Sequence, residues 1–277
     1  MDMNEIYVSK EQSRKIQELE LQALIEIDRI CRKHGINYTL TCGSLLGAVR
    51  HGGFIPWDDD IDIAMMRNDL IKFEEVCKTE LDHKYFYQSH HTEQDYFRLY
   101  SKLRINNTIF KESVHSNHNI NHGIYIDIFP IDYTPNNKLK KALHILLYKI
   151  FSYGLSAKYL NIQARSGKKK MMACFLRLVY LPFTKEFLYR NADKIAMRYK
   201  DTNDKLDTII FSGPYLEKEC FEYGMFTQYC DIQFEENDVM IISNYKEYLE
   251  SVYGDYMKLP PKEKQVSHHN ITELKLI

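Results

Sequence analysis

The segment from Gly43 to Asp62 constrains this chain most, because it combines glycines, a serine and closely spaced carboxylates within 20 residues. Its four glycines, at 43, 47, 52 and 53, let the backbone turn and bring N–H groups close to a ligand. The apolar run 45–49 predicts a short helix whose first free N–H groups would attract an anionic phosphate. We therefore expect Gly43 and Ser44 to bind phosphate groups of a substrate.

Three carboxylates at a spacing of two residues, Asp58, Asp60 and Asp62, end this segment. In an extended strand, side chains two residues apart project from the same face, so Asp60 and Asp62 converge. A hard divalent cation with oxygen ligands relieves the repulsion between such carboxylates. The spacing therefore predicts one or two Mg²⁺ ions. Asp58, close to Pro56, is either a further ligand or a turn residue, and Asp59 points away with a structural role.

A further carboxylate, Asp127, lies in the otherwise apolar and aromatic run 125–129. An ionised carboxylate in such surroundings is costly unless it is paired or bound to a metal. Two interpretations are open: Asp127 is the third ligand of the metal site, or it forms an ion pair with Lys102 or Arg104. These two cations alternate on one predicted strand face, which suits either a clamp for a diphosphate or a solvent-exposed hairpin.

These motifs resemble those of a known family. A Gly-Ser turn followed by Asp-x-Asp on a strand is similar to the nucleotidyltransferase superfold, and the whole segment 43–62 resembles the LicD/fukutin-related phosphotransferases. The resemblance continues in Gly-Ile-Tyr-Ile-Asp-Ile-Phe-Pro-Ile-Asp at 123–132. It is looser in Tyr-Gly-Asp-Tyr-Met-Lys-Leu-Pro-Pro at 253–261, with His268 and His269 beyond. It covers the first half and the last quarter of the chain and leaves out the middle.

The resemblance implies a Mg²⁺-dependent phosphotransferase that moves phosphocholine from CDP-choline to a hydroxyl of a cell-surface glycan of the teichoic acid, lipopolysaccharide or capsule type. Asp60, Asp62 and Asp127 would hold the metal, and Asp127 would also act as the general base. Transfer of glycerol or ribitol phosphate from a CDP-polyol is the alternative within the same class. A glycosyltransferase that uses a nucleotide sugar, and a non-catalytic, membrane-associated assembly factor, are the rivals from other classes.

Other residues near these motifs are candidate substrate ligands. Arg50 and His51 follow the Gly-Ser turn and either hold phosphate or cap the end of the helix. Trp57, the sole tryptophan, would box a choline head together with Tyr125 through cation–π attraction, or it anchors the core. His269 either reaches the phosphate or the acceptor, or it lies in a surface tail.

The charge of the chain is uneven. Residues 138–200 hold 15 Lys or Arg against two acidic residues, a local charge of +13, although the whole chain carries −1. Basic residues interleaved with apolar ones at helical spacing suit an interfacial helix on anionic lipid, or a solvated helical face. No nucleic-acid-binding motif accompanies this charge. A lipid-linked acceptor would give membrane contact a purpose.

Cysteine usage and the N-terminus predict the compartment. Six cysteines are scattered without a Cys-x-x-Cys pair, which is typical of reduced thiols. Residues 1–10 lack the apolar stretch of a signal peptide, and no apolar run reaches the roughly 18 residues of a membrane-spanning helix. We therefore expect a cytoplasmic protein, either free or peripheral on the inner face of the membrane. The sequence does not predict the oligomeric state.

The expected fold is α+β: a nucleotidyltransferase-like core with a mixed sheet flanked by helices, plus a helical insertion. We divide the chain into a catalytic core 1–135, a basic helical insertion 136–205 and a segment 206–277 that returns to the core. The predicted helices run from a capping box at Ser9 to Gly35, from Asp69 to about Leu81, and over 139–150, 171–181, 187–199 and 243–253. The predicted strands are 37–42, 60–65, a hairpin of 96–105 with 108–111, a strand 123–129 ended by Pro130, 208–211 and 239–242.

Overall fold

The structure is a computed structural model that describes residues 6–159, 161–162, 166–202, 204–216, 218–266 and 269–276. Its helices are α1 Lys10–His34, α2 Cys42–His51, α3 Arg67–Glu80, α4 Lys138–Tyr159, α5 Gly167–Val179, α6 Lys185–Ala196 and α7 Tyr245–Tyr253, with 3₁₀ turns at Ser113–His115, Met197–Tyr199 and Lys262–Lys264. Its strands are β1 Thr39–Leu40, β2 Ile61–Met66, β3 Tyr85–Gln88, β4 Ser101–Ile105, β5 Ile109–Glu112, β6 Tyr125–Thr134, β7 Asp207–Ile209, β8 Cys220–Phe221, β9 Tyr229–Phe234, β10 Asn237–Ile242 and β11 Ile271–Lys275.

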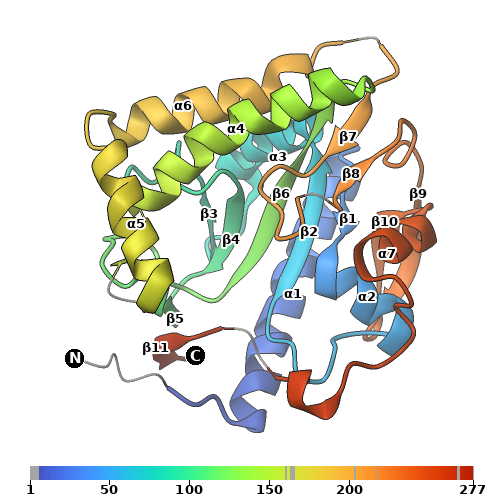
Figure 1. The fold of residues 1–277 in the computed structure, drawn as a ribbon. Coiled ribbons are helices and arrows are strands. Elements are labelled where there is room, and N and C mark those ends of the chain that lie inside the picture. The colour runs from blue at the N-terminus through green and yellow to red at the C-terminus, as the bar shows by residue number, and fades with distance from the viewer. Residues whose placement is uncertain are drawn as a thin grey trace.

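The central sheet is mixed, which confirms the predicted α+β class. Its main order is β1-β2-β6-β4-β3, and β7 and β8 extend it from β6. Strands β2 and β6 are parallel, and the other pairs are antiparallel. Two smaller sheets, β9 with β10 and β5 with β11, lie beside it. Figure 1 shows β2 and β6 running through the middle of the molecule with α1 and α3 behind them.

Helix α1 is the element that the sequence predicts most accurately. Ser9 and Gln12 form the predicted capping box, and Gly35 ends the helix in the left-handed conformation. Its apolar stripe, which includes Ile16, Leu24 and Ile27, is fully buried in the main core. One face of the sheet packs into the same core. Its isoleucines alternate along the strands with the candidate site residues; they are Ile61, Ile63, Ile126 and Ile128.

Strand pairing differs from the prediction in the middle of the chain. The strands at 101–105 and 109–112 exist, but they do not form a hairpin: β4 pairs with β3 and β6, and β5 pairs with β11. Strand β6 also continues through Pro130. Its antiparallel partner changes there, because β4 pairs as far as Ile128 and β7 begins at Asp132. Pro130 is tolerated because, on the side of β6 that faces β4 and β7, no strand pairs with this residue.

Helix α3 begins earlier than predicted, at Arg67, so Asp69 lies in its first turn and is not its cap. The predicted helices of the middle segment are confirmed as α4, α5 and α6, and α4 extends to Tyr159. Figure 1 shows α4 and α6 side by side across one end of the sheet, with α5 on the outer side. Small clusters around Tyr148 and Leu155 attach these helices to the core.

All six cysteines are free thiols, as predicted. Within the described ranges, no helix combines the length and the apolar character that crossing a bilayer requires.

Candidate active site

The candidate site is built on three neighbouring strands. Asp62 on β2 and Asp127 on β6 are direct partners in the parallel register, and Lys102 on β4 is the antiparallel partner of Asp127. Residues in register share a face of the sheet, so two carboxylates and an ammonium form one cross-strand row. The structure thus brings together residues that are far apart in the sequence, as predicted for Asp62 and Asp127.

Asp60 and Asp58 extend this row in the loop that leads into β2. Burial and the charges of Asp60 and Asp127 raise the pKa of Asp62 well above its usual range. Burial, Asp60 and Asp59 raise the pKa of Asp58 to about 8, and Asp58 shares a hydrogen bond with Asp60. The carboxylates therefore lie close enough to repel one another, which is the condition that a divalent cation relieves.

The first turn of α2 holds Asp62 in place. The backbone N–H of Asp62 donates to Ser44 Oγ at 2.8 Å, and its carbonyl accepts from the N–H of Thr41 at 3.0 Å. A Cβ at Gly43 would lie 2.5 Å from Asp58 Oδ2, so only glycine allows this carboxylate to approach the helix. The Gly-Ser pair therefore positions two of the aspartates. Its predicted contact with substrate phosphate stays a prediction.

Lys102 is paired with Asp127 inside the protein. Its Nζ lies 2.5 Å from Asp127 Oδ1 and 3.2 Å from the centroid of the Tyr125 ring, and its side chain is only 2% exposed. Burial lowers the pKa of Lys102, and the adjacent Asp127 opposes this effect. The interpretation of Asp127 as an ion-pair partner is thus observed, with Lys102 and not with Arg104.

The expectation of an exposed hairpin face for Lys102 and Arg104 is wrong, because both side chains are buried. Arg104 donates to Gln88 Oε1 at 2.8 Å and to the carbonyl of Gly123 at 2.7 Å. Its guanidinium lies 4.6 Å from the centroid of the Tyr125 ring. The two protein cations and the surrounding core enclose Tyr125, so this ring does not offer an open face to choline.

His269 crosses from the C-terminal segment to the carboxylates. Its Nδ1 lies 3.0 Å from Asp59 Oδ1, and its Nε2 lies 3.6 Å from Asp60 Oδ2. Burial alone would lower the pKa of His269, but the hydrogen bond with Asp59 and the charge of Asp60 raise it to about 10. The prediction that His269 belongs near the site is thus supported by its position, whereas the surface-tail alternative is wrong. His268 lies outside the described residues.

Of the remaining predicted ligands, Arg50 and His51 lie at the C-terminal end of α2, and Trp57 lies in the loop that follows. Arg50 donates to the carbonyl of Tyr256 at 2.9 Å, and His51 packs edge-on against Trp57 with ring centroids 6.2 Å apart. Trp57 is partly buried and packs against the main core, which agrees with a core anchor. No described contact joins these three side chains to the carboxylates.

Sequence reasoning missed a buried carboxylate beneath the site. Glu20 on α1 is buried, and its Oε2 has no hydrogen-bond partner among the described residues. Burial, followed by the charges of Asp60 and Asp59, raises the pKa of Glu20 well above its usual range. The signal was present, because helical spacing places Glu20 on the buried stripe with Ile16 and Ala23.

A strained turn before α2 was also missed. Cys42 has a φ of 48°, which is unusual for a residue with a side chain. The turn is held by Tyr248, whose hydroxyl lies 2.5 Å from Thr41 Oγ1 and donates to Glu219 Oε1 at 3.3 Å. Tyr248 and Glu219 are distant in sequence from residue 42, and no local pattern would have identified them.

The aspartates of the site offer the carboxylate oxygens that a hard divalent cation prefers as ligands, and such a cation would relieve their mutual repulsion. In the described part of the chain, however, no three His, Cys, Asp or Glu side chains are arranged to hold an ion. The reason is visible in the contacts: Lys102 pairs with Asp127, and His269 lies against Asp59 and Asp60. Two side chains of the protein itself, Lys102 and His269, thus lie against the carboxylates that the sequence predicts as metal ligands.

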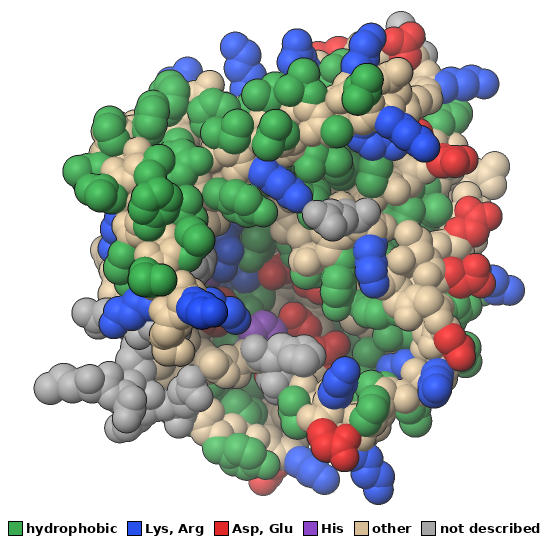
Figure 2. Space-filling model, viewed as in Figure 1, with side chains coloured by type: hydrophobic (Ala, Val, Ile, Leu, Met, Phe, Trp, Pro, Cys, Tyr) green, Lys and Arg blue, Asp and Glu red, His purple; other side chains and the backbone are tan. Residues whose placement is uncertain are grey.

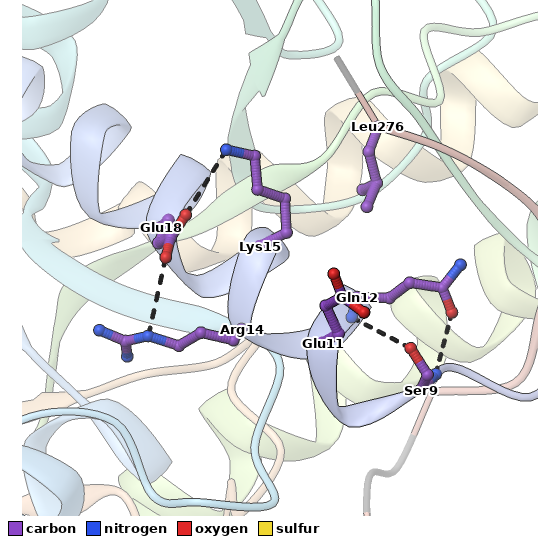
Figure 3. A pocket seen from close by; sticks show the side chains of 7 residues that line it. All are labelled: Ser9, Glu11, Gln12, Arg14, Lys15, Glu18 and Leu276. Carbon is purple, nitrogen blue, oxygen red and sulfur yellow. Dashed lines mark hydrogen bonds and ion pairs between the residues drawn. The ribbon is translucent and has the colours of Figure 1, made fainter.

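The site opens into a hollow on one face of the molecule. Figure 2 shows this hollow in the middle of the view, with acidic side chains and a histidine at its floor. A separate groove of about 820 Å³ runs along the first turns of α1, between Ser9 and Glu18. Figure 3 shows that its charged side chains pair with one another, because Glu18 contacts both Arg14 and Lys15. None of the candidate site residues lines this groove.

Comparison with known proteins agrees with this geometry. The sequence pattern described as LicD/FKTN/FKRP, nucleotidyltransferase domain, matches residues 35–159. The lipopolysaccharide cholinephosphotransferase LicD of Haemophilus influenzae is 29% identical over 257 residues, which are 87% of this chain and 89% of that protein. The human ribitol 5-phosphate transferase FKRP is 37% identical over 87 residues, which are 28% of this chain and 18% of FKRP. The matched region contains the carboxylates of β2 and β6.

Proposed function

We propose that this chain, whose residues 35–159 match the LicD/FKTN/FKRP family, transfers phosphocholine from CDP-choline to a hydroxyl of a cell-surface glycan. The observation that carries the proposal is the register of Asp62 with Asp127 on two parallel strands, with Asp60 beside them. Two relatives, the cholinephosphotransferase LicD and the ribitol 5-phosphate transferase FKRP, both transfer a phosphate-linked group. Phosphotransfer is therefore the chemistry that this site supports best.

Phosphocholine is favoured as the transferred group because the similarity to LicD extends over most of the chain, whereas the similarity to FKRP covers a short segment. The corresponding acceptor is a lipopolysaccharide, teichoic acid or capsule glycan. A CDP-polyol donor is the second candidate, supported by the local similarity to FKRP.

Asp60, Asp62 and Asp127 would hold Mg²⁺, which when bound neutralises the charge of the donor phosphates. Asp127 accepts the proton of the acceptor hydroxyl, whose oxygen bonds to the phosphorus that carries choline. The bond from that phosphorus to CMP breaks, and CMP leaves. Ser44 and Gly43 keep Asp62 and Asp58 in position, and His269 holds Asp59 and orients the loop before β2.

The test offers the purified protein CDP-choline, CDP-glycerol, CDP-ribitol and UDP-hexoses with an acceptor glycan, and measures nucleotide release. We expect CMP release with CDP-choline, and we expect Asp62→Asn to lower it by at least about 100-fold because a ligand is lost. Asp238→Asn, an exposed aspartate on β10, is the matched control and should leave the rate unchanged.

The rival functions give different results in the same experiment. Release of CMP only from a CDP-polyol would move the proposal to polyol phosphate transfer. Release of UDP alone would contradict phosphotransfer. Glycan modification that is unchanged in a variant carrying both Asp60→Asn and Asp62→Asn would favour a non-catalytic assembly factor.

A further inference from the structure

Exposed apolar side chains are concentrated on the helices of the middle segment. Of the 22 large apolar side chains that are exposed in the described part of the chain, 13 lie between Leu139 and Phe187. Figure 2 shows hydrophobic side chains gathered at the upper left, where Figure 1 places α5 and the adjoining ends of α4 and α6. Exposed patches of this kind mark surfaces that meet another apolar phase.

Helix α5 presents its apolar side outward. Within the helix only Ala173 is buried, whereas Met171, Phe175 and Leu178 are 71%, 60% and 68% exposed. These three residues follow helical spacing, so they lie on one side of the helix, and Met172 and Val179 widen the same side. A helix that packs on a protein core normally turns this side inward. We call these five residues, with Leu181 after the helix, the apolar face of α5.

Basic residues accompany this face. Lys168, Lys169, Lys170 and Arg177 are exposed on α5, and the helix contains no acidic residue. The surrounding segment 138–200 carries a charge of +13. An apolar stripe with lysines at its border complements a surface that is apolar inside and anionic outside. Two copies of this chain joined through the face would instead bring like charges together.

We propose that α5 lies in the headgroup region of an anionic membrane, with its apolar face toward the acyl chains and its lysines on the lipid phosphates. The hollow with the acidic floor opens on the same side of the molecule that Figure 2 shows, so docking through α5 keeps the site beside the membrane surface. The purpose of docking, access to a lipid-linked acceptor, rests on the proposed function. Binding itself is measured without turnover, so the two proposals fail separately.

The experiment measures co-sedimentation of the full chain with vesicles of equal parts phosphatidylglycerol and phosphatidylcholine, and with phosphatidylcholine alone. We expect binding to the anionic vesicles that weakens as NaCl is raised. A variant with Lys168→Gln, Lys169→Gln and Lys170→Gln should bind about 100-fold more weakly, since each lysine near such a surface contributes roughly five-fold. A variant with Met171→Ser, Phe175→Ser and Leu178→Ser should lose at least about 10-fold.

Matched controls separate the face from general charge and apolar content. Lys10→Gln, Lys246→Gln and Lys262→Gln remove the same charge from exposed positions elsewhere, and Ile25→Ser removes an exposed apolar side chain from α1. These variants should bind like the wild type, and unchanged unfolding midpoints show that all variants fold. Equal vesicle binding by the α5 variants and the wild type would overturn the proposal. So would a dimer in sedimentation velocity that the Met171, Phe175 and Leu178 substitutions abolish.

Discussion

Lys102 shows how the charge of one buried residue in this site is balanced by the opposite charge of another. It is a buried ammonium group between the carboxylate of Asp127 and the ring of Tyr125, at 2.5 Å and 3.2 Å. In this position its positive charge lies directly against the carboxylate of Asp127. Removing one partner of a buried ion pair leaves the other partner uncompensated, which is costly. The pair is therefore a sensitive probe of whether a cation can take its place.

We predict that Lys102→Met lowers the free energy of unfolding by about 3 kcal/mol in EDTA, because Asp127 loses its partner. Addition of MgCl₂ should restore part of this loss, since the ion can then pair with Asp127. Urea unfolding with and without Mg²⁺ measures both effects. Lys33→Met is the control: it breaks an exposed pair with Glu80 and should cost less than about 1 kcal/mol in either buffer. A Lys102→Met protein as stable as the wild type, or one indifferent to Mg²⁺, would refute this account.

The residues of the site were only partly predictable from the sequence. Asp60, Asp62 and Asp127 stand out because carboxylates alternate with isoleucines on buried strands. The contacts that hold the turn before α2 do not stand out, because Glu219 and Tyr248 reach it through the fold and not through any local spacing. His269 was predicted only through the loose family resemblance of the last segment, and its partner Asp59 was not predicted. The interpretation of Tyr125 as part of a choline box failed for the same reason: its neighbours Lys102 and Arg104 come from another strand.

At the scale of elements, local signals in the sequence predicted the helices correctly. They did not predict which strands pair, because the partners lie far apart in the chain. Caps and 3.6-residue periodicity identify α1 and the three helices of the middle segment. Strand β4 pairs with β3 and β6, and β5 pairs with β11 from the end of the chain. A turn at Asn106 and Asn107 therefore resembles a hairpin in sequence without being one. Strand partners depend on the whole sheet, which no short window contains.

His144 joins three elements and provides a test of how the helical segment is attached. Its Nδ1 lies 3.0 Å from Thr134 Oγ1 on β6, and its Nε2 lies 2.7 Å from the carbonyl of Ile195 on α6. The carbonyl requires a proton on Nε2, so Nδ1 accepts from the threonine hydroxyl. Burial lowers the pKa of His144 below its usual range, and the hydrogen bond with the Ile195 carbonyl and the charge of Asp132 only partly oppose this. Protonation of His144 would place a charge in this buried position and would force the Thr134 hydroxyl to change from donor to acceptor.

We predict that acid destabilises the protein in part through His144. Below about pH 6.5, the unfolded chain binds a proton at this residue that the folded chain does not, so the free energy of unfolding falls as the pH falls. His144→Gln keeps a donor and an acceptor without titrating. Below pH 6.5 its unfolding free energy should therefore fall less steeply than that of the wild type, by up to about 1.4 kcal/mol per pH unit. Urea unfolding from pH 7.5 to 5 measures the slopes.

The control for this experiment is His83→Gln, which changes a histidine whose side chain is 93% exposed. Its slope should match that of the wild type. Parallel slopes for His144→Gln and the wild type would show that burial of His144 does not contribute to acid sensitivity.

At the scale of the whole molecule, the fold collects distant segments at one place. The loop before β2, the start of β6 and the segment that leads into β11 bring Asp60, Asp127 and His269 together. The same face of the molecule carries the hollow and, beside it, the exposed apolar group over α4 to α6 (Figure 2). The sheet that carries the candidate site and the basic helical segment thus share one face of the molecule (Figure 2). Under the two proposals above, a soluble donor and an acceptor at a membrane would meet on this face.

The most direct test of the central claim is Mn²⁺ binding, measured by isothermal titration calorimetry as a substitute for Mg²⁺. The account predicts that the wild type binds one or two ions and that Asp62→Asn weakens binding by at least about 10-fold, because an oxygen ligand is lost between Asp60 and Asp127. Asp238→Asn should bind like the wild type. Identical Mn²⁺ affinity in Asp62→Asn and the wild type would contradict the account, because these carboxylates would then not hold the metal.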